Sequence, residues 1–353
     1  MSQYIFIKEA KQFFDRVQNS SRILLISHSN PDGDAIGSVT GLRNYLRFKG
    51  INSEIAVPNS YPEYLSFLDE NKEIKIFCNN PKESIEFADK ADLIIALDFN
   101  QLSRVDELEK HVLDSNAFKV LIDHHPMPEV ESFNLVISNP EVSSTAELIF
   151  WILMTLEAEN CGKVIHNCKG VLSADVARSL YVGMMTDTNN FSNSVNSATF
   201  LMASILMESG VDKDMLQHLV FGGFSELRMR LLGHMLLNKM VIVGSYGAGY
   251  ICLSAEEQMK YNFSEGDSEG FVNLPLNIKG INISALFTER EDHIRVSLRS
   301  TNDFSVNRLS RLHFNGGGHE RAAGGKLYIP FVEVADYFEQ SLAVSFDECM
   351  KKN

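Results

Sequence analysis

Four stretches of this sequence place acidic or imidazole side chains at the ends of apolar segments, where they could do chemistry. The residues are His28, Asp32 and Asp34 in "ISHSNPDGDAIGS", Asp98 in "IIALDF", Asp123, His124 and His125 in "LIDHHP", and Asp187 in "GMMTDTNNF". Ionisable groups at the end of a buried strand are costly to hold without compensation. These side chains therefore need a turn, a salt-bridge partner or a metal ion.

Each cluster also has a purely structural explanation when it is taken alone. The Asp-Gly-Asp stretch at 32–34 fits a turn, Asp98 could cap a helix, and the histidine pair at 124–125 could be structural. A calcium loop is excluded, because it needs Glu at its twelfth position and no count from Asn30, Asp32 or Asp34 reaches one. The occurrence of all three clusters at strand ends favours one shared site.

The residue types of this shared site favour divalent cations. Aspartates and histidines without a thiolate suit Mn²⁺ first, or Mg²⁺, rather than structural zinc. So many carboxylates would repel one another unless more than one cation lay among them. A two-metal centre stabilises both the attacking and the leaving oxygen in phosphoryl transfer. The set therefore predicts metal-dependent chemistry at phosphorus.

The segments that must position these residues look like buried parallel strands alternating with helices. The expected strands are 22–28, 91–99 and 118–125, and the expected helices are 37–50, 144–159 and 173–188. Near-continuous apolar runs are typical of strands covered on both faces. The alternation predicts an α/β domain with a mostly parallel sheet. In such sheets ligands bind outside the carboxyl ends of the strands, which places the clusters along one edge.

The chain changes character after about residue 196. From there to about residue 240 we expect helices. Expected strands at 247–255, 281–289 and 292–300 then indicate an α+β domain. We expect a metal-binding catalytic domain over 1–212, a helical linker over 213–240 and a smaller substrate-binding domain over 241–346. The active site is expected in the cleft between the two domains.

Composition narrows the class of protein. A length of 353 residues predicts about two domains, and the net charge of −14 argues against binding long nucleic acid without excluding a small anionic substrate. No apolar run reaches the roughly 20 residues that span a membrane. The first 17 residues suggest an amphipathic helix rather than a signal peptide. Five cysteines without metal-site spacing fit a reduced, cytoplasmic compartment.

A glycine run in "FNGGGHERAAGG" is the second chemical feature. Gly316, Gly317 and Gly318 allow the backbone to approach a ligand closely, and Asn315 tolerates positive φ. With a helix expected to start at 319–323, their N–H groups would form an anion-binding nest. The alternative is a flexible loop without a ligand.

Upstream of this run, Arg299 and Ser300 in "VSLRS" are suited to phosphate recognition. Alone, Arg299 is equally explained as a surface residue of a strand. The glycine run is not a P-loop, because no Gly-Lys-Ser/Thr follows it.

The motifs "HSNPDGDAIGS", "LDF", "IDHHP", "TDT" and "GGGHERAAGG" occur here in the order found in the DHH/DHHA1 phosphoesterases, which the chain resembles from residue 22 to residue 325. Within that family it is most similar to the nanoRNase group, the bifunctional oligoribonuclease and 3′-phosphoadenosine-5′-phosphate (pAp) phosphatases. The resemblance implies hydrolysis of short 5′-phosphorylated RNA to mononucleotides, and of pAp to AMP, by a hydroxide that two metal ions activate. Asn189 and Asn315 stand where the family pattern has glycine.

The resemblance also implies roles for the residues. One Mn²⁺ would be held by His28, Asp32 and Asp98, and the other by Asp34, Asp98, His124 and Asp187, with Asp98 bridging. His125 would face the substrate phosphate, and Asp123 would orient its neighbouring histidine. The nucleotide would be bound by Arg299, Ser300, Gly316, Gly317, Gly318 and His319, with His319 or Phe314 as candidates for stacking on a base.

Other functions remain open at this point. Enzymes of the same fold cleave pyrophosphate or polyphosphate, cyclic dinucleotides or single-stranded DNA, and a non-enzymatic nucleotide-binding module is the alternative from another class. The expected partners are short RNA and pAp as substrates, without long nucleic acid or membrane, and a second copy in a homodimer.

Overall fold

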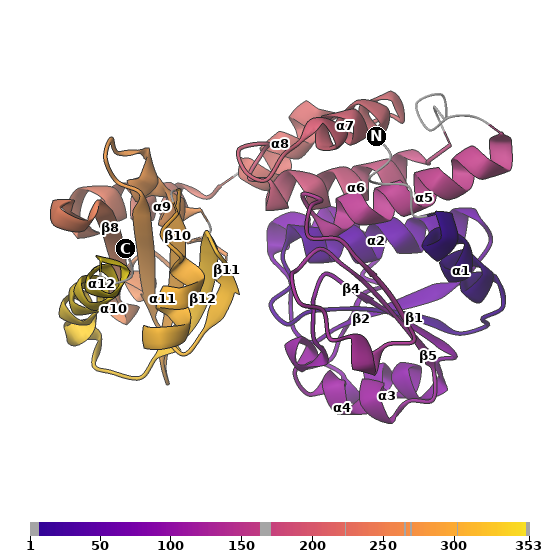
Figure 1. Cartoon of the computed structure of the whole chain (residues 1–353), viewed down its shortest axis with the longest axis horizontal. Coiled ribbons are helices and arrows are strands. Elements are labelled where there is room, and N and C mark those ends of the chain that lie inside the picture. The colour runs from indigo at the N-terminus through magenta and orange to yellow at the C-terminus, as the bar shows by residue number, and fades with distance from the viewer. Residues whose placement is uncertain are drawn as a thin grey trace. The chain divides into compact units, whose positions relative to one another are not determined.

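The computed structural model of the chain describes residues 7–162, 171–222, 224–264, 266–268, 270–301 and 303–350. It forms two compact units, an N-terminal unit (Met1–Gly223) and a C-terminal unit (Phe224–Asn353), each with its own sheet (Figure 1). The start of the expected N-terminal helix, residues 1–6, lies outside the described part. The remainder of it is α1 (Ile7–Gln18).

The N-terminal unit contains a six-stranded parallel sheet in the order β3-β2-β1-β4-β5-β6. The strands are β1 (Ile23–Ser27), β2 (Ser53–Val57), β3 (Lys75–Ile76), β4 (Leu93–Leu97), β5 (Phe118–Asp123) and β6 (Leu135–Ser138). The three predicted strands are confirmed as β1, β4 and β5. They are neighbours in the sheet, so their carboxyl ends meet at one edge.

Helices cover both faces of this sheet (Figure 1). They are α2 (Gly33–Phe48), α3 (Pro81–Lys90), α4 (Leu108–Asp114), α5 (Thr145–Cys161), α6 (Ala174–Asp187), α7 (Ser197–Glu208) and α8 (Lys213–Phe221), with short 3₁₀ helices η2 (Glu63–Leu68), η3 (Leu102–Val105) and η4 (Val130–Ser132). Side chains of β1 alternate between the two cores: Leu25 packs in the core shared with α2 and α5, and Leu24 in the core shared with α3 and α4. Burial on both sides explains the continuous apolar runs.

A close approach between α2 and α6 brings two parts of the site together. Gly183 on α6 has no side chain, and a Cβ there would lie 2.6 Å from Cβ of Ala146 and 2.8 Å from Oδ1 of Asp34. Glycine at this position therefore allows the Asp34 carboxylate to pack directly against α6. The same helix ends at Asp187, which is how that acid reaches the edge of the sheet.

The C-terminal unit contains a second six-stranded sheet, in the order β11-β12-β10-β9-β8-β7, in which only β8 and β9 run parallel. Its strands are β7 (Met240–Val243), β8 (Ala248–Leu253), β9 (Ile283–Glu289), β10 (Ile294–Ser300), β11 (Gly317–His319) and β12 (Ala322–Leu327). Its helices are α9 (Glu226–His234), η6 (Met235–Lys239), η7 (Gly244–Tyr246), α10 (Ala255–Lys260), η8 (Phe271–Asn277), α11 (Val306–His313), η9 (Phe331–Glu333) and α12 (Val334–Met350). The three strands expected after residue 240 are confirmed as β8, β9 and β10. Among the described helices of the chain, none is long and apolar enough to cross a membrane.

The predicted helix start at 319–323 is wrong. This segment forms the turn and first strand residues of an antiparallel β11–β12 hairpin, and β12 pairs in turn with β10. The glycines explain the outcome, because a Cβ on Gly316 would lie only 1.9 Å from the carbonyl oxygen of Gly324. Backbone packing and sheet pairing thus outweigh the local preference for a helix, and the predicted nest at a helix N-terminus is absent.

Candidate active site

The loop after β1 supplies the first group of candidate ligands. Asp32 is the N-cap of α2, where its Oδ1 accepts hydrogen bonds from the backbone N–H groups of Asp34 (3.0 Å) and Ala35 (3.1 Å). Nδ1 of His28 lies 2.9 Å from the carbonyl oxygen of Ser29. Because a carbonyl only accepts, Nδ1 carries the proton, and the lone pair lies on Nε2.

Asp98 lies at the centre of the cluster, directly after β4 and 2% exposed. Its Oδ2 is 3.4 Å from Nε2 of His28, and its Oδ1 is 3.8 Å from Nε2 of His124. Its backbone φ is +68°, a left-handed conformation that is uncommon for residues other than glycine. A hydrogen bond from its N–H to the carbonyl of Ile122 (3.2 Å) ties this conformation to the neighbouring strand β5.

A second group of ligands forms around Asp34. This carboxylate is 1% exposed and accepts the backbone N–H groups of Thr145 (2.6 Å to Oδ2) and Ala146 (2.9 Å to Oδ1), in the first turn of α5. Nε2 of His124 lies 3.5 Å from Oδ2 of Asp187. One ligand atom each from Asp34, His124 and Asp187 lies within 4.8 Å of the others. The same holds for His28, Asp32 and Asp98, so the edge of the sheet presents two adjoining ligand groups.

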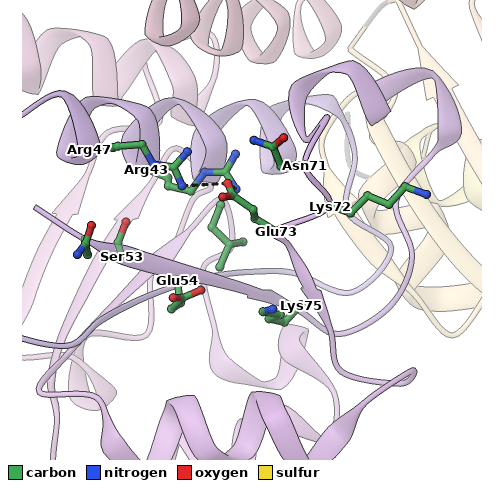
Figure 2. Close-up of a pocket in the computed structure, with 10 residues that line it drawn as sticks. Arg43, Arg47, Ser53, Glu54, Asn71, Lys72, Glu73 and Lys75 are labelled. Carbon is green, nitrogen blue, oxygen red and sulfur yellow. Dashed lines mark hydrogen bonds and ion pairs between the residues drawn. The ribbon is translucent and has the colours of Figure 1, made fainter.

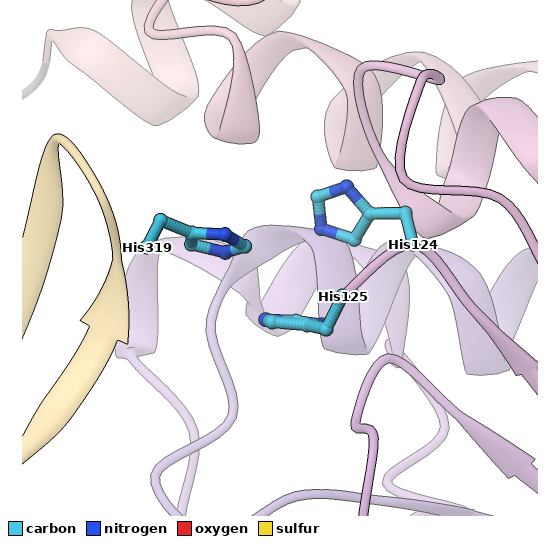
Figure 3. A group of neighbouring side chains, drawn as sticks. All are labelled: His124, His125 and His319. Atoms are coloured by element: carbon cyan, nitrogen blue, oxygen red, sulfur yellow. The ribbon is translucent and has the colours of Figure 1, made fainter. Parts of the chain in front are cut away.

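The two consecutive histidines have different partners. Nδ1 of His125 is 2.7 Å from Oδ1 of Asp123, whereas Nε2 of His124 faces Asp187. Their rings lie 4.8 Å apart at an angle of 69° (Figure 3). Asp123 is fully buried, and its Oδ2 has no hydrogen-bond partner. The structure thus brings together all eight predicted residues of the N-terminal unit.

Burial makes this cluster electrostatically unfavourable without a cation. It lowers the pKa of His28 and raises the pKa of Asp34. Burial, and then the neighbouring carboxylates of Asp34, Asp32, Asp187 and Asp123, raise the pKa of Asp98 well above its ordinary value. Carboxylate oxygens with imidazole nitrogens and no sulfur are ligands for Mn²⁺ or Mg²⁺. The residues present therefore fit divalent cations.

The predicted residues of the C-terminal unit lie on β10 and on or directly before β11, the two strands that flank β12. Ala322 pairs with Arg299 on one side and with His319 on the other. Directly opposed residues share a face of the sheet, so the arginine and the histidine flank a small alanine, about 10 Å apart. Ser300 is buried, and its hydroxyl donates to the carbonyl of Phe304 (2.8 Å).

The residues of the glycine run differ in whether the backbone conformation or the packing requires glycine. Gly318 has a φ of +144°, and Asn315 has a φ of +47°, as expected for a residue at a glycine-like position. Gly316 is required by the packing of the hairpin. A Cβ on Gly317, however, would meet its nearest atom at 3.6 Å, an ordinary contact. The suggestion that Phe314 stacks on a base is wrong, because this ring is fully buried in the core.

Sequence reasoning missed Thr145, which contacts two of the acids. Its backbone N–H binds Asp34, and its hydroxyl donates to Oδ1 of Asp98 (2.9 Å). The available signal was the pattern "SSTAE", in which Ser144 and Glu147 have the spacing of a capping box and mark a helix N-terminus.

A separate polar pocket of 430 Å³ lies between the end of α2 and the start of β2 (Figure 2). Its two arginines are paired with acids of the protein. Arg43 Nη1 lies 3.3 Å from both Asp69 and Glu73, and Arg47 Nη2 lies 2.9 Å from Glu73. This pocket is therefore a salt-bridge network, unlike the repelling acids at the strand ends.

Domains of known protein families match both units. The N-terminal domain of the DHH family matches residues 22–184, and the DHHA1 domain matches residues 247–341. All eight candidate residues of the N-terminal unit except Asp187 lie within the first match, and Arg299, Ser300 and the glycine run lie within the second.

Relatives cover nearly the whole chain. The probable bifunctional oligoribonuclease and PAP phosphatase NrnA of Streptococcus mutans is 27% identical, over 90% of this chain and 93% of its own length. The bifunctional oligoribonuclease and PAP phosphatase NrnA of Bacillus subtilis is 28% identical, over 87% and 89%. A crystal structure of an exopolyphosphatase-related protein from Bacteroides fragilis is 37% identical with a TM-score of 0.89, and the match covers 97% of this chain and 98% of that one.

Proposed function

The chain belongs to the DHH family of phosphoesterases and carries a DHHA1 domain, and we propose that it hydrolyses pAp to AMP and short 5′-phosphorylated oligoribonucleotides to mononucleotides in a reaction that depends on divalent cations. The observation that carries this proposal is the pair of ligand groups that adjoin at Asp98. Relatives named as bifunctional oligoribonuclease and PAP phosphatase support the choice of substrates.

In this proposal each ligand group holds one cation. His28, Asp32 and Asp98 would hold the first, and Asp34, His124 and Asp187 the second, with Asp98 shared between them. When bound, two such cations, Mn²⁺ or Mg²⁺, supply Lewis acidity to the attacking water and neutralise the charge that develops on the phosphate.

His125 acts on the phosphate itself. Asp123 Oδ1 accepts a hydrogen bond from Nδ1–H at 2.7 Å, so the orientation of the ring is fixed, with Nε2 directed to the reacting group. From that position the doubly protonated ring donates from Nε2–H to a phosphate oxygen and stabilises its charge as the bond to the leaving oxygen breaks, while the Asp123 carboxylate balances the positive charge of the ring. Asp123 stays buried and makes no contact with substrate.

The C-terminal unit binds the rest of the substrate. Arg299 offers a planar guanidinium to a second phosphate, and His319, in the same row of the sheet, offers a ring beside it. The fold has room for a side chain at Gly317, so the glycine there is not required by packing. Its absence of a side chain leaves the backbone open to a ligand. A short substrate held by such local contacts is compatible with a net charge of −14.

The test is release of phosphate and mononucleotide in the presence of Mn²⁺ or Mg²⁺. The panel contains pAp, 5′-phosphorylated RNA of two to five nucleotides, a cyclic dinucleotide, pyrophosphate and long single-stranded DNA, and Asp98→Asn serves as the inactive control. We expect turnover of pAp and of the short RNAs, falling with length, and none after chelation. Turnover of pyrophosphate or of the cyclic dinucleotide alone would overturn the substrate assignment, and full activity after exhaustive chelation would overturn the metal dependence.

A further inference from the structure

The N-terminus of α5 holds two of the candidate ligands in a fixed relation. The backbone N–H groups of Thr145 and Ala146 bind one oxygen each of Asp34, at 2.6 Å and 2.9 Å. The hydroxyl of Thr145 donates to Oδ1 of Asp98 at 2.9 Å. A single residue, fully buried, thus contacts a carboxylate from each ligand group.

These contacts orient the two carboxylates and still leave lone pairs for a cation. A carboxylate oxygen has two lone pairs, so Oδ2 of Asp34, which accepts the N–H of Thr145, retains one for a cation, whereas Oδ1 accepts the N–H of Ala146 and a longer contact from the hydroxyl of Ser38 (3.4 Å). With both of its oxygens bonded, the carboxylate plane of Asp34 cannot rotate freely. The positive end of the dipole of α5, a helix of 17 residues, also favours a charged carboxylate at this point.

Thr145 is held in turn by Glu147. This side chain is fully buried, and its Oε2 accepts from the backbone N–H of Ser143 (3.0 Å) and from the hydroxyl of Thr199 on α7 (3.0 Å). Its Oε1 accepts from Nε1 of Trp151 (3.1 Å), and the hydroxyl of Ser143 donates to Oε2 at 2.5 Å. Four donors from three segments therefore fix the turn that presents Thr145.

We propose that Thr145 is a positioning residue that sets the relation between Asp34 and Asp98, and hence between the two cation positions, and that Glu147 keeps Thr145 in place. The proposal rests on the proposed function, because it concerns the same pair of cation sites. It adds that the spacing of the two sites is fixed by the start of α5, an element that supplies no ligand of its own.

The experiment compares Thr145→Val with Thr145→Ser. Valine keeps the shape and the backbone N–H to Asp34 but removes the hydroxyl that binds Asp98, whereas serine keeps the hydroxyl. Thr155→Val is the matched control, since Thr155 is a buried threonine of the same helix whose hydroxyl donates to the carbonyl of Trp151 (2.7 Å). Mn²⁺ binding is measured by calorimetry, and the coupling between two bound Mn²⁺ ions by electron paramagnetic resonance, alongside kcat and KM for pAp.

We expect Thr145→Val to lower kcat and to weaken Mn²⁺ binding by roughly 10- to 100-fold each, and to change the coupled Mn²⁺ spectrum. Thr145→Ser should restore all three, and Thr155→Val should leave them unchanged. Wild-type kcat, Mn²⁺ affinity and spectrum in Thr145→Val would overturn the proposal. If the wild-type protein itself bound a single Mn²⁺, or hydrolysed none of the panel, the proposed function would fail first, and the two failures are thereby distinguished.

The role of Glu147 is tested by Glu147→Gln, which keeps its size but turns one acceptor into a donor that faces other donors. We expect the same altered Mn²⁺ spectrum as for Thr145→Val. Thr199→Val provides a milder version, because it removes one of the four donors and leaves the carboxylate in place. An unchanged Mn²⁺ spectrum in a folded Glu147→Gln protein would confine the positioning role to Thr145.

Discussion

Replacement of Asp123 by Asn tests whether a buried carboxylate acts through the neighbouring imidazole. Asp123 is fully buried, and its Oδ1 lies 2.7 Å from Nδ1 of His125, a distance typical of a charge-assisted hydrogen bond. Asparagine has the same shape but no charge, and its amide group brings two donors into a place where Oδ2 of Asp123 meets no partner. The orientation of His125 is then no longer fixed, and the positive charge of its ring is no longer balanced.

The structure sets the size of the effect. A hydrogen bond to a charged group contributes about 1.5–3 kcal/mol, and about 1.4 kcal/mol of barrier corresponds to a factor of ten in rate. We therefore expect Asp123→Asn to lower kcat for pAp by about 10- to 150-fold. KM should change by less than about twofold, because in this mechanism the carboxylate helps to stabilise the transition state and does not touch the substrate.

The assay measures kcat, KM and the number of bound Mn²⁺ ions for Asp123→Asn and for a matched control, Asp92→Asn. Asp92 lies just before β4, at the opposite end of the strand from Asp98, and accepts the backbone N–H groups of Ser21 (2.7 Å) and Arg22 (3.0 Å). The control should retain wild-type kinetics. A folded Asp123→Asn protein with wild-type kcat would refute the reasoning. Loss of one Mn²⁺ from it would also do so, because Asp123 would then be a ligand itself.

Three further predictions concern the C-terminal unit. Arg299→Ala should raise KM for pAp by about 10- to 100-fold with unchanged Mn²⁺ binding, because it removes a charge-assisted contact to phosphate; an unchanged KM on every substrate would remove Arg299 from the site. Gly317→Ala should leave the melting temperature unchanged and raise KM, whereas Gly316→Ala should lower the melting temperature, since its Cβ would lie 1.9 Å from a carbonyl oxygen; equal melting temperatures for the two variants would contradict the packing argument. Burial acts to raise the pKa of Glu257, but hydrogen bonds from Lys239, Ser254 and His234 outweigh it and lower the pKa from 4.5 to about 2. Because the folded pKa is depressed, the ionised carboxylate stabilises the fold above pH 4.5, by at most about 3 kcal/mol, and this contribution is lost as the pH falls from 4.5 towards 2. Glu257→Gln should remove that pH dependence in urea unfolding followed by circular dichroism, while the fluorescence of the single tryptophan, Trp151 in the N-terminal unit, should report an unchanged transition.

Three strands of the N-terminal sheet, β1, β4 and β5, could be predicted because their signal is local. Strands covered on both faces are apolar at every position, and the acids that end them stand out in the sequence. The position of Thr145 could not be predicted in the same way, since its partners Asp34 and Asp98 are 111 and 47 residues away. Its own neighbours indicate only the start of a helix.

The segment at 319–323 shows the opposite failure, in which a local signal was misleading. Two alanines after charged residues favour a helix, yet the segment pairs with β10 through Ala322. The glycines on either side allow two backbones to approach more closely than side chains would permit. A packing constraint of this kind depends on β10 and β12 being adjacent, which the spacing of residues along the chain does not encode.

Two departures from ordinary protein structure coincide at the edge of the parallel sheet. Asp98 holds a left-handed backbone, and Asp123 buries a carboxylate oxygen without a hydrogen bond. Each costs free energy of folding, of the order of 1–3 kcal/mol. Neither is needed to form the sheet, because β4 ends before Asp98 and the ladder of β5 is complete without the second oxygen of Asp123. Such features persist where the surroundings hold them in place for a ligand. The strain, the repelling acids and the turn at Thr145 that orients them therefore have one common explanation, a site built for cations before they bind.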